Sequence, residues 1–454
     1  MLFMPFNILG FWFRGLLSIA ILAGGIYLLS RWYDDSHATE VVEEPVVTAP
    51  SDADRRVEVR AFANEGTVPT RRIFRFDPGW NRPTLELAAA LALLTWATMG
   101  RLIGIRFQMM FLRSGADAGT GLPTRVSKKI RRRNAKLRKA MQTPPEEDVD
   151  PSEDRTGTVH TINRPDGSEI RVECYGPAAA PPIIWTHGWG ANSTEWFYQK
   201  RYLIDRFRLI LWDIPGAGLS KKPDNNDFRM ENLAADLGAV VSVAGGRPAI
   251  LVGHSIGGMI TLTFCKMFPE MLQSRIAGIV LAHTTYTNPV RTTQMAALYT
   301  AIEKPIIIPM LYLTIALWPF AWLMNWMSYF NGSAHRSTHK SSFAGNETRG
   351  QLDFCSRFMP HARPDVLARG MLGMIAYDAT GVLRDITVPT LVIVGDKDTT
   401  TPPKAGEFIA GQVPGAEVVT LTPAKHMGLI EHHDRFDRVV AGFATSCQTA
   451  VTIR

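Results

Sequence analysis

The residues best suited to chemistry in this sequence are a serine, an aspartate and a histidine in its second half. Ser255, Asp398 and His426 each follow a short apolar run of the kind that forms a buried strand. A neutral hydroxyl is a poor nucleophile, so a serine needs a histidine to take its proton and a carboxylate to orient that histidine. The three residues therefore predict a nucleophilic serine that attacks an acyl carbon. The alternatives that stay open are Asp396 for the acid and His432 or His433 for the base.

The surroundings of Ser255 are typical of a sharp strand-to-helix turn, the nucleophile elbow. The motif Gly253-His254-Ser255-Ile256-Gly257 lies between the apolar run 249–252 and a helical stretch at 259–267. Glycines beside the serine permit a strained turn and close packing of neighbouring chains. The helix that begins there directs N–H groups and its positive dipole end toward a nearby oxyanion. We therefore expect the backbone N–H of Ile256 to be an oxyanion donor.

These residues need a scaffold that brings strand ends together, and the sequence from Thr158 onward predicts one. Short β-rich runs alternate with helical stretches, the pattern of an α/β domain. Pro165-Asp166-Gly167 is a turn that joins the first two runs into a hairpin, and most later runs are continuously apolar, as in parallel strands covered on both faces. We predict an eight-stranded, mostly parallel sheet with helices on both faces. The predicted strands are 158–163, 170–175, 183–186, 208–212, 249–252, 278–282, 390–394 and 417–421.

With these motifs the chain resembles the α/β-hydrolase superfamily over roughly residues 158–443. A further match is the turn Asp213-Ile214-Pro215-Gly216-Ala217-Gly218-Leu219-Ser220, similar to the D-x-P-G-x-G-x-S turn of that family. The resemblance implies the fold, the triad and a cap inserted at about 284–385. Dehalogenase-like and epoxide-hydrolase-like relatives carry aspartate at the nucleophile position. Serine there implies chemistry through an acyl-enzyme.

A second glycine-rich motif, His187-Gly188-Trp189-Gly190, follows the predicted strand 183–186. Folds of this kind place the second half of the oxyanion hole there, which makes the backbone N–H of Trp189 the expected partner of the Ile256 donor. Each preorganised donor contributes about 3 to 4 kcal/mol in a dry site. An ordinary glycine-rich turn is the alternative.

Two apolar stretches before the α/β region predict membrane helices. Phe11 to Leu29 is long enough to cross a bilayer core, with a cleaved signal peptide as the alternative. Leu85 to Ile105 is interrupted by Glu86 and Arg101, whose side chains can reach the membrane interface. A buried soluble helix is the alternative for this second stretch. We expect residues 1–142 to form a membrane-anchor region.

Charge is concentrated in the segment that follows these stretches. Residues 125–139 contain nine basic side chains and no acidic one, more than the net charge of +7 of the 454-residue chain. No aromatic residue interleaves them, so we expect contact with anionic lipid headgroups and not with nucleic acid. Positive charge on the cytoplasmic side would place the catalytic part in the cytoplasm. The acidic, Pro-rich segment 143–155 predicts a linker before a catalytic domain at 156–454.

The sequence predicts neither a metal site nor a cofactor. The four cysteines lie far apart without a C-x-x-C pair, which favours buried free thiols. The cluster Glu431-His432-His433-Asp434 lacks a coherent ligand spacing, and we interpret it as the solvated start of the last helix.

The predicted cap contains the clearest indication of substrate type. Pro305 to Ala334 has no charged residue and sets Trp318, Trp322 and Trp326 at helical spacing on one face. A membrane span here would separate Ser255 from its two partners. We therefore expect a lid, buried over an acyl pocket or lying on a membrane surface, with an ordinary apolar cap helix as the alternative.

Together these features predict a membrane-anchored serine hydrolase of the esterase or lipase kind, acting on a lipophilic ester. An acyltransferase or lactonase with the same triad is the first alternative, because water and an acceptor alcohol compete for the same acyl-enzyme. A catalytically silent, membrane-tethered scaffold is the second. The intact triad and both glycine contexts argue against that second alternative.

Overall fold

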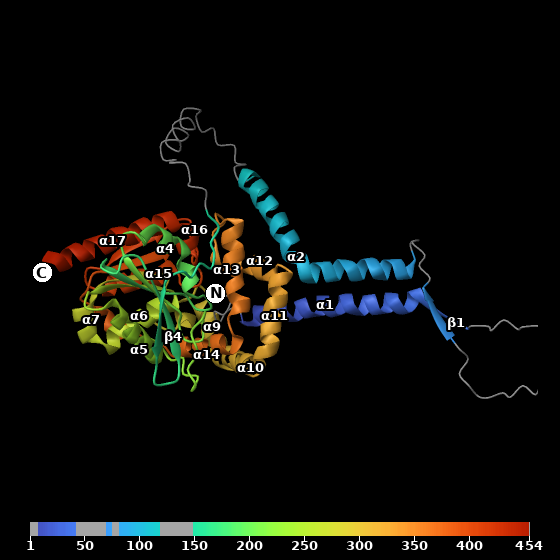
Figure 1. Cartoon of the computed structure of the whole chain (residues 1–454), viewed down its shortest axis with the longest axis horizontal. Helices are drawn as coiled ribbons and strands as arrows, with labels where there is room; N and C mark the ends of the chain where they lie inside the picture. The colour runs from blue at the N-terminus through green and yellow to red at the C-terminus, as the bar shows by residue number, and fades with distance from the viewer. Residues whose placement is uncertain (1–7, 42–69, 75–80, 119–148, 454) are drawn as a thin grey trace, which may run out of the picture. The chain divides into compact units, whose positions relative to one another are not determined.

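A computed structural model describes residues 8–41, 70–74, 81–118 and 149–453 of the chain (Figure 1). It divides into two compact units: Ser18–Thr98, and a larger unit of Met1–Leu17 with Met99–Arg454. The basic run 125–139 and the first part of the predicted linker lie outside the described residues. The end of that linker contacts the catalytic domain, because Arg155 Nη1 lies 3.1 Å from both Glu173 Oε1 and Asp213 Oδ2.

The smaller unit consists of two antiparallel helical segments and a two-stranded ribbon. Most of α1 (Ile8–Ser36) and the first part of α2 (Arg82–Ala118) belong to it. Close to one end of the pair, Arg31 Nη2 lies 3.4 Å from Glu86 Oε1. The ribbon pairs β1 (His37–Val41) with β2 (Thr70–Phe74). Helices thus form over both predicted apolar stretches.

Two helices among the described residues are long and apolar enough to cross a membrane. They are Gly10–Ser36, with a mean hydropathy of 1.7, and Ala296–Ala316, with a mean hydropathy of 1.3. The first contains the predicted span 11–29. Membrane passage of the second predicted stretch, 85–105, stays a prediction.

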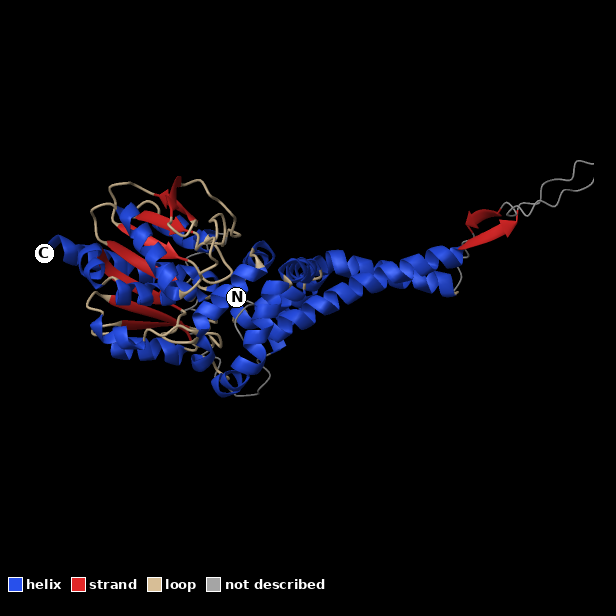
Figure 2. Cartoon of the chain, turned by 90° about the horizontal axis from the view of Figure 1, so that it is seen from below, coloured by secondary structure: helices blue, strands red, loops and turns tan. Residues whose placement is uncertain are grey.

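The larger unit is built on an eight-stranded sheet, in the order β10-β9-β8-β7-β5-β6-β4-β3 (Figure 2). β3 pairs antiparallel with β4 and β4 pairs antiparallel with β6, whereas the other pairs are parallel. This confirms the predicted mostly parallel sheet. The strands are β3 (Thr158–Asn163), β4 (Glu169–Tyr175), β5 (Pro182–Thr186), β6 (Arg208–Trp212), β7 (Ala249–His254), β8 (Ile276–Ala282), β9 (Thr390–Gly395) and β10 (Glu417–Leu421).

Helices cover both faces of this sheet. α4 (Phe197–Leu203) and α17 (His433–Ile453) pack together on one face, and α5 (Met230–Val241), α6 (Ile256–Met267) and α15 (Pro403–Gln412) lie on the other. The central strands β5, β7 and β8 are buried along their whole length, which explains their continuous apolar sequence. The remaining short helices are η2 (Ser193–Trp196), η3 (Ser242–Ala244), α7 (Pro269–Arg275) and α16 (Gly428–Glu431). All four cysteines are free thiols, as the sequence predicts.

A helical cap lies in the chain between β8 and β9. Its elements are α8 (Pro289–Thr292), α9 (Ala296–Ile302), the π-helical turn η4 (Glu303–Ile307), α10 (Ile308–Ala316), α11 (Trp318–Phe330), α12 (Ser333–Ser342), α13 (Arg349–His361), α14 (Pro364–Ile375) and η5 (Thr380–Asp385). The three tryptophans of α11 face the end of α13 and the residues just beyond it: Trp322 Nε1 donates to Pro360 O at 2.7 Å, and the guanidinium of Arg363 lies 4.3 Å from the Trp318 ring. All three thus contact the segment around the end of α13, with the ring centroids of Trp326 and His361 5.6 Å apart, and Trp322 remains 43% exposed.

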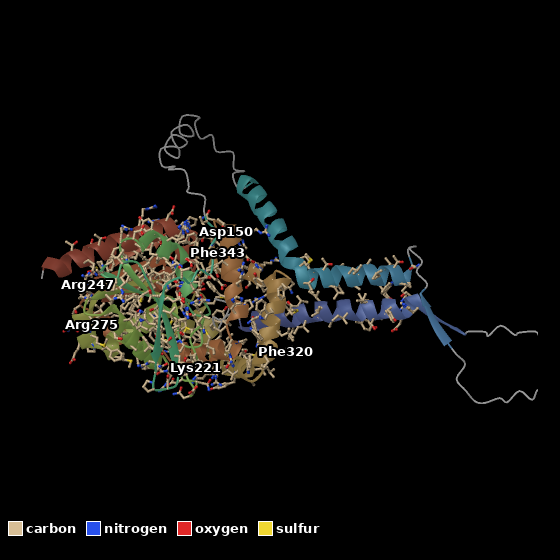
Figure 3. The ribbon with its side chains drawn as sticks, viewed as in Figure 1. Asp150, Lys221, Arg247, Arg275, Phe320 and Phe343 are labelled. Atoms are coloured by element: carbon tan, nitrogen blue, oxygen red, sulfur yellow. The ribbon has the colours of Figure 1, made fainter. Side chains whose placement is uncertain are left out.

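Large apolar side chains remain exposed on the outer surface of the cap. Phe320, labelled on α11 in Figure 3, is one of them. The set, which we call the cap apolar face, is Met295, Leu298, Ile306, Tyr312, Leu313, Leu317, Phe320, Trp322 and Leu323.

Candidate active site

Ser255 occupies a strained turn between β7 and α6. Its φ of 54° and ψ of −116° lie in a region that residues with a side chain rarely adopt. The flanking glycines permit this turn because the chain packs so closely there. A Cβ on Gly253 would lie 2.4 Å from the carbonyl carbon of Gly257, and one on Gly257 would lie 2.3 Å from Thr186 O. The turn places Ser255 at the carboxyl edge of the sheet, where ligands bind in open α/β folds.

The structure brings the three predicted triad residues together. Ser255 Oγ lies 3.1 Å from His426 Nε2, and His426 Nδ1 lies 2.7 Å from Asp398 Oδ2. Asp398 Oδ1 accepts the backbone N–H groups of Thr400 at 2.8 Å and Thr401 at 3.0 Å, which fixes the carboxylate. The two loops that follow β9 and β10 thus deliver the acid and the base to the serine.

The alternative acid and bases have other partners. Asp396 Oδ1 accepts the backbone N–H of Ala424 at 2.8 Å and so shapes the loop that carries His426. His433 stacks on Tyr198, with ring centroids 3.8 Å apart. His432 Nε2 lies 2.5 Å from the backbone carbonyl oxygen of Pro423. The geometry therefore favours Asp398 and His426 for the proton-transfer chain.

Burial sets the protonation states of the acid and the base. His426 is fully buried, and loss of hydration lowers its pKa from 6.5 to about 4, although the charge of Asp398 acts in the opposite direction. Burial raises the pKa of Asp398, but the charge of His426 and hydrogen bonds from His283 and His426 outweigh it and hold the pKa well below its ordinary value. At neutral pH the arrangement is a neutral imidazole beside an ionised carboxylate, as a general base requires.

Both predicted oxyanion donors lie in segments that flank Ser255. Ile256 is the first residue of α6, so its N–H has no acceptor within the helix. Trp189 lies in the turn after β5, and its indole Nε1 donates to Leu367 O of α14 at 3.0 Å. A Cβ on Gly370 of the same helix would lie 2.0 Å from the Trp189 ring. The cap therefore packs directly on the loop that carries this donor.

The supporting residues of the two motifs shape the same loops. His187 Nε2 accepts the backbone N–H of Ile214 at 3.0 Å, so its Nδ1 carries the proton and donates to Gly188 O at 2.8 Å. Gly190 adopts a φ of 80°, which favours glycine. A Cβ on Gly188 would lie 2.7 Å from His254 Nδ1.

Two buried residues near the triad were missed by sequence reasoning. His283 follows β8 with a φ of 48°, and its Nδ1 lies 3.2 Å from Asp398 Oδ2. Glu195 lies in η2 and contacts His254, the residue before the nucleophile, at 3.0 Å. These contacts join positions 115 and 59 residues apart, and neither residue belongs to a motif. No local sequence signal identifies them.

His283, Asp398 and His426 are also grouped closely enough to hold a metal ion, with ligand atoms within 4.8 Å of one another. A metal ion bound there would coordinate His426, which could then not act as the base for Ser255. Because the same atoms already form a continuous hydrogen-bonded chain to the serine, we assign the cluster to proton transfer.

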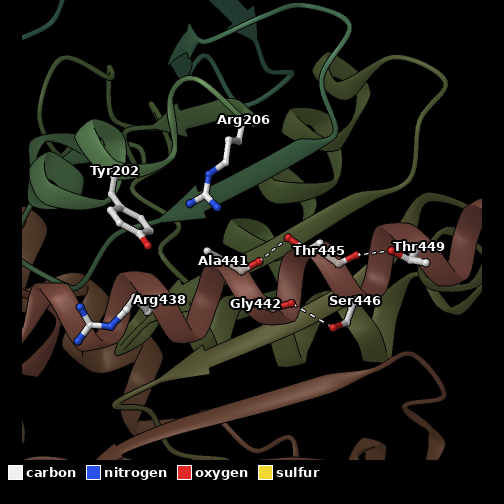
Figure 4. Close-up of a pocket in the computed structure, with 8 residues that line it drawn as sticks. All are labelled: Tyr202, Arg206, Arg438, Ala441, Gly442, Thr445, Ser446 and Thr449. Atoms are coloured by element: carbon white, nitrogen blue, oxygen red, sulfur yellow. Dashed lines mark hydrogen bonds between the residues drawn. The ribbon is translucent and has the colours of Figure 1, made fainter.

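A surface hollow lies away from this chemistry. It is an open groove of about 750 Å³ along α17 (Figure 4). The Ser and Thr hydroxyls of α17 donate to helix carbonyls one turn earlier, for example Thr445 Oγ1 to Ala441 O at 2.8 Å. The lining residues are Tyr202, Arg206, Arg438, Ala441, Gly442, Thr445, Ser446 and Thr449.

A smaller cavity lies between the cap and the site, and its lining includes Glu195, Phe358, Met359 and Met427. Its volume of about 10 Å³ is enough for one water molecule at most. Ser255 itself is only 3% exposed. Ser255 is therefore largely shielded from solvent in this structure.

Comparisons with known proteins agree with this architecture. Pimeloyl-[acyl-carrier protein] methyl ester esterases from Methylococcus capsulatus and Nitrosospira multiformis are 27% and 24% identical, over 59% and 61% of this chain and 95% and 98% of their own lengths. A biotin biosynthesis bifunctional protein from Teredinibacter turnerae is 28% identical over 55% of this chain, and the match spans only 42% of that relative.

Solved structures show the same fold. An esterase from Exiguobacterium antarcticum superposes with a TM-score of 0.53 at 22% identity, over 63% of this chain and 100% of its own. A hydrolase from Pseudomonas aeruginosa does so with a TM-score of 0.52 at 23% identity, over 63% and 98%. Residues 181–433, more than half of the chain, match the family described as the alpha/beta hydrolase fold. The chain therefore belongs to the alpha/beta hydrolase fold family.

Proposed function

We propose that this protein is a serine hydrolase that cleaves a carboxylic ester, or a related acyl bond, of a lipophilic substrate at or near a membrane. The observation that carries the proposal is the hydrogen-bonded chain from Ser255 through His426 to Asp398, at 3.1 and 2.7 Å. Relatives whose names describe methyl ester esterases support ester chemistry.

The geometry supports a two-step reaction. His426 Nε2 takes the proton of Ser255 as Oγ attacks the acyl carbon, and Asp398 stabilises the imidazolium that forms. The backbone N–H groups of Trp189 and Ile256 would stabilise the oxyanion. His426 then donates its proton to the leaving alcohol, and a water molecule activated by the same imidazole releases the acid. An acyltransferase or lactonase would differ only in the group that accepts the acyl chain.

A lipophilic substrate and membrane lipid as a partner are supported by two apolar surfaces. The most apolar part of Gly10–Ser36 is only 17% buried. The cap apolar face lies on the helical insertion that packs on the Trp189 loop. Trp12 Nε1 of α1 donates to Thr314 Oγ1 of α10 at 3.2 Å, so the first turns of α1 contact this cap.

The second apolar helix, Ala296–Ala316, fits a membrane surface better than a membrane span. Ser255 precedes it in the chain, whereas Asp398 and His426 follow it. A single crossing there would separate groups that hydrogen-bond to one another. We propose that the cap rests on the bilayer, with the catalytic domain on the cytoplasmic side as the basic run 125–139 suggests.

The proposal is tested by covalent labelling. Full-length protein in detergent micelles is treated with a fluorophosphonate, which modifies activated serines, and the modified residue is found by peptide mass spectrometry. We expect labelling at Ser255 and loss of both labelling and ester turnover in Ser255→Ala. Unchanged turnover in Ser255→Ala would refute the proposal.

A further inference from the structure

A further histidine contacts the acid of the proposed triad. His283 follows β8 and is buried, and its Nδ1 lies 3.2 Å from Asp398 Oδ2. Its Nε2 is also buried and meets no hydrogen-bond partner within the described part of the chain. The proton transfers described above assign this residue no role.

The surroundings of this imidazole differ from those of an ordinary core histidine. A core histidine normally has both ring nitrogens satisfied, because a buried polar atom without a partner destabilises the fold. In His283 one nitrogen lacks such a partner and the other faces Asp398. An apolar side chain would fill the same space without that penalty. The side chain therefore fits a role at the acid better than a role in packing.

The backbone around His283 is bonded both to the nucleophile and to the strand before the acid. Ala282 O accepts the N–H of Ser255 at 2.9 Å, and Thr284 Oγ1 donates to Ser255 O at 2.6 Å. The N–H of His283 donates to Ile393 O of β9 at 2.8 Å. This short segment therefore bridges the nucleophile elbow and β9.

The contact of His283 falls on the carboxylate oxygen that orients the base. Asp398 Oδ2 faces His426 Nδ1 at 2.7 Å, Thr401 Oγ1 at 2.9 Å and His283 Nδ1 at 3.2 Å. Thr401 belongs to the loop of the acid, whereas His283 is fixed to the sheet. His283 thus ties Oδ2 to the frame that also holds Ser255. It restrains this oxygen whichever of the two facing atoms carries the proton.

We propose that His283 is a positioning residue that holds Oδ2 of Asp398 and thereby aligns His426 with the nucleophile. The inference rests on the proposed function and adds a positioning side chain to that site. Without this contact Oδ2 keeps only its partners from the acid and base loops, so a displacement of the carboxylate also displaces the imidazole. Proton transfer from the serine depends on that alignment.

The test removes the contact with and without a replacement donor. His283 has a φ of 48°, a region in which glycine and asparagine are tolerated. His283→Gly removes the side chain without straining the backbone. In His283→Asn the amide nitrogen takes approximately the place of Nδ1, so the contact with Asp398 is retained.

Two measurements on the full-length protein in micelles distinguish positioning from folding. One is steady-state hydrolysis of a p-nitrophenyl ester. The other is the rate constant of fluorophosphonate labelling at Ser255, which does not depend on how much of the sample is folded. We expect kcat and the labelling rate constant to fall about ten- to hundredfold in His283→Gly with KM nearly unchanged, because alignment of the base affects the transition state and not substrate binding. His283→Asn should bring both back to within about threefold of the wild type.

The matched control is Asp236→Ala. Asp236 is a fully buried side chain of α5 whose Oδ1 accepts Arg164 Nε at 2.8 Å, so this variant removes a buried polar contact outside the site. We expect a lower melting temperature but the labelling rate constant of the wild type. A merely structural role of His283 would give this same pattern in His283→Gly.

Failure of this positioning role and failure of the proposed function give different results. Absence of labelling at Ser255 in the wild type would refute the function itself. With a labelled wild type, the positioning role alone is overturned by an unchanged rate constant in His283→Gly, by an equally slow His283→Asn, or by an equal loss in Asp236→Ala. If His283→Gly does not fold, His283→Leu, which fills the space of the ring without a polar atom, takes its place in the same comparison.

Discussion

At the residue scale, the groups that face each ring nitrogen distinguish two neighbouring imidazoles. His426 faces a hydroxyl and a carboxylate, so one of its nitrogens is free to accept a proton from Ser255. His254 faces a carboxylate and a carbonyl, which both accept. The two imidazoles therefore have different hydrogen-bonding roles in the same buried site.

The role assigned to Asp398 predicts a large effect from a minimal change. Asp398→Asn keeps the shape of the side chain but removes the charge that stabilises the imidazolium, and its amide favours the wrong tautomer of His426. We expect kcat for ester hydrolysis to fall by roughly 10³ to 10⁴-fold. Steady-state kinetics on the full-length protein in micelles would measure it.

Asp396→Asn is the matched control for that change. Its side chain keeps an oxygen that can accept the Ala424 N–H, so the loop of His426 stays in place. We expect kcat to remain within about threefold of the wild type, since only one hydrogen bond is weakened. If the large loss occurred at Asp396 instead, Asp398 would not be the acid.

At the element scale, close approach between backbone segments explains why the elbow is rich in glycine. Gly257 of α6 packs against the carbonyl oxygen of Thr186 at the end of β5. This contact sets the distance between the start of α6 and the oxyanion loop that follows β5. The two donor segments are thus positioned by backbone packing as well as by side-chain hydrogen bonds.

A methyl group added at this contact should lower the free energy of unfolding. In Gly257→Ala the added Cβ would lie 2.3 Å from Thr186 O, so β5 and α6 must separate. We expect a loss of about 2 to 4 kcal/mol in the free energy of unfolding. Differential scanning fluorimetry of the full-length protein in detergent should show a melting temperature lower by several degrees.

Gly442→Ala provides the comparison on a helix without such a contact. Gly442 lies inside α17, and a Cβ there would meet no atom within 4 Å. Alanine favours helix over glycine by about 0.5 to 1 kcal/mol, so we expect an unchanged or slightly higher melting temperature. Equal destabilisation of both variants would contradict the packing argument.

The strands were predictable from the sequence because most are apolar runs with turn residues at their ends, and their observed bounds follow the predicted ones closely. Ser255, Asp398 and His426 could be placed because each lies shortly after a predicted strand. Glu195 and His283 could not, because their contacts depend on how η2 and the end of β8 pack in three dimensions. The direction of the α11 tryptophans likewise depends on α13, which no local pattern specifies.

At the scale of the whole molecule, exposed apolar surface on the cap suggests how access to the site could be controlled. Ser255 is almost completely buried, while the cap apolar face remains in contact with solvent. Contact with a bilayer would remove that face from water and stabilise whichever cap position exposes it most. If that contact shifts the cap away from Ser255, the site would open preferentially where lipophilic substrate is concentrated.

This mechanism predicts that a charge on the cap apolar face lowers hydrolysis of an ester dissolved in a bilayer but not hydrolysis of a water-soluble ester. Tyr312→Glu and Leu323→Glu replace side chains that are 59% and 47% exposed, so the fold should tolerate them. In full-length protein reconstituted into nanodiscs, we expect kcat/KM toward a long-chain ester dissolved in the bilayer to fall roughly tenfold or more. Hydrolysis of a water-soluble short-chain ester should stay near the wild-type value, because the triad is unaffected.

Met267→Glu, at the far end of α6 from Ser255, is the matched control and should preserve both activities. Equal loss of kcat/KM toward both esters in the cap variants would show that the charges disturb the cap itself. No loss of kcat/KM toward either ester would refute a role of the bilayer in cap opening.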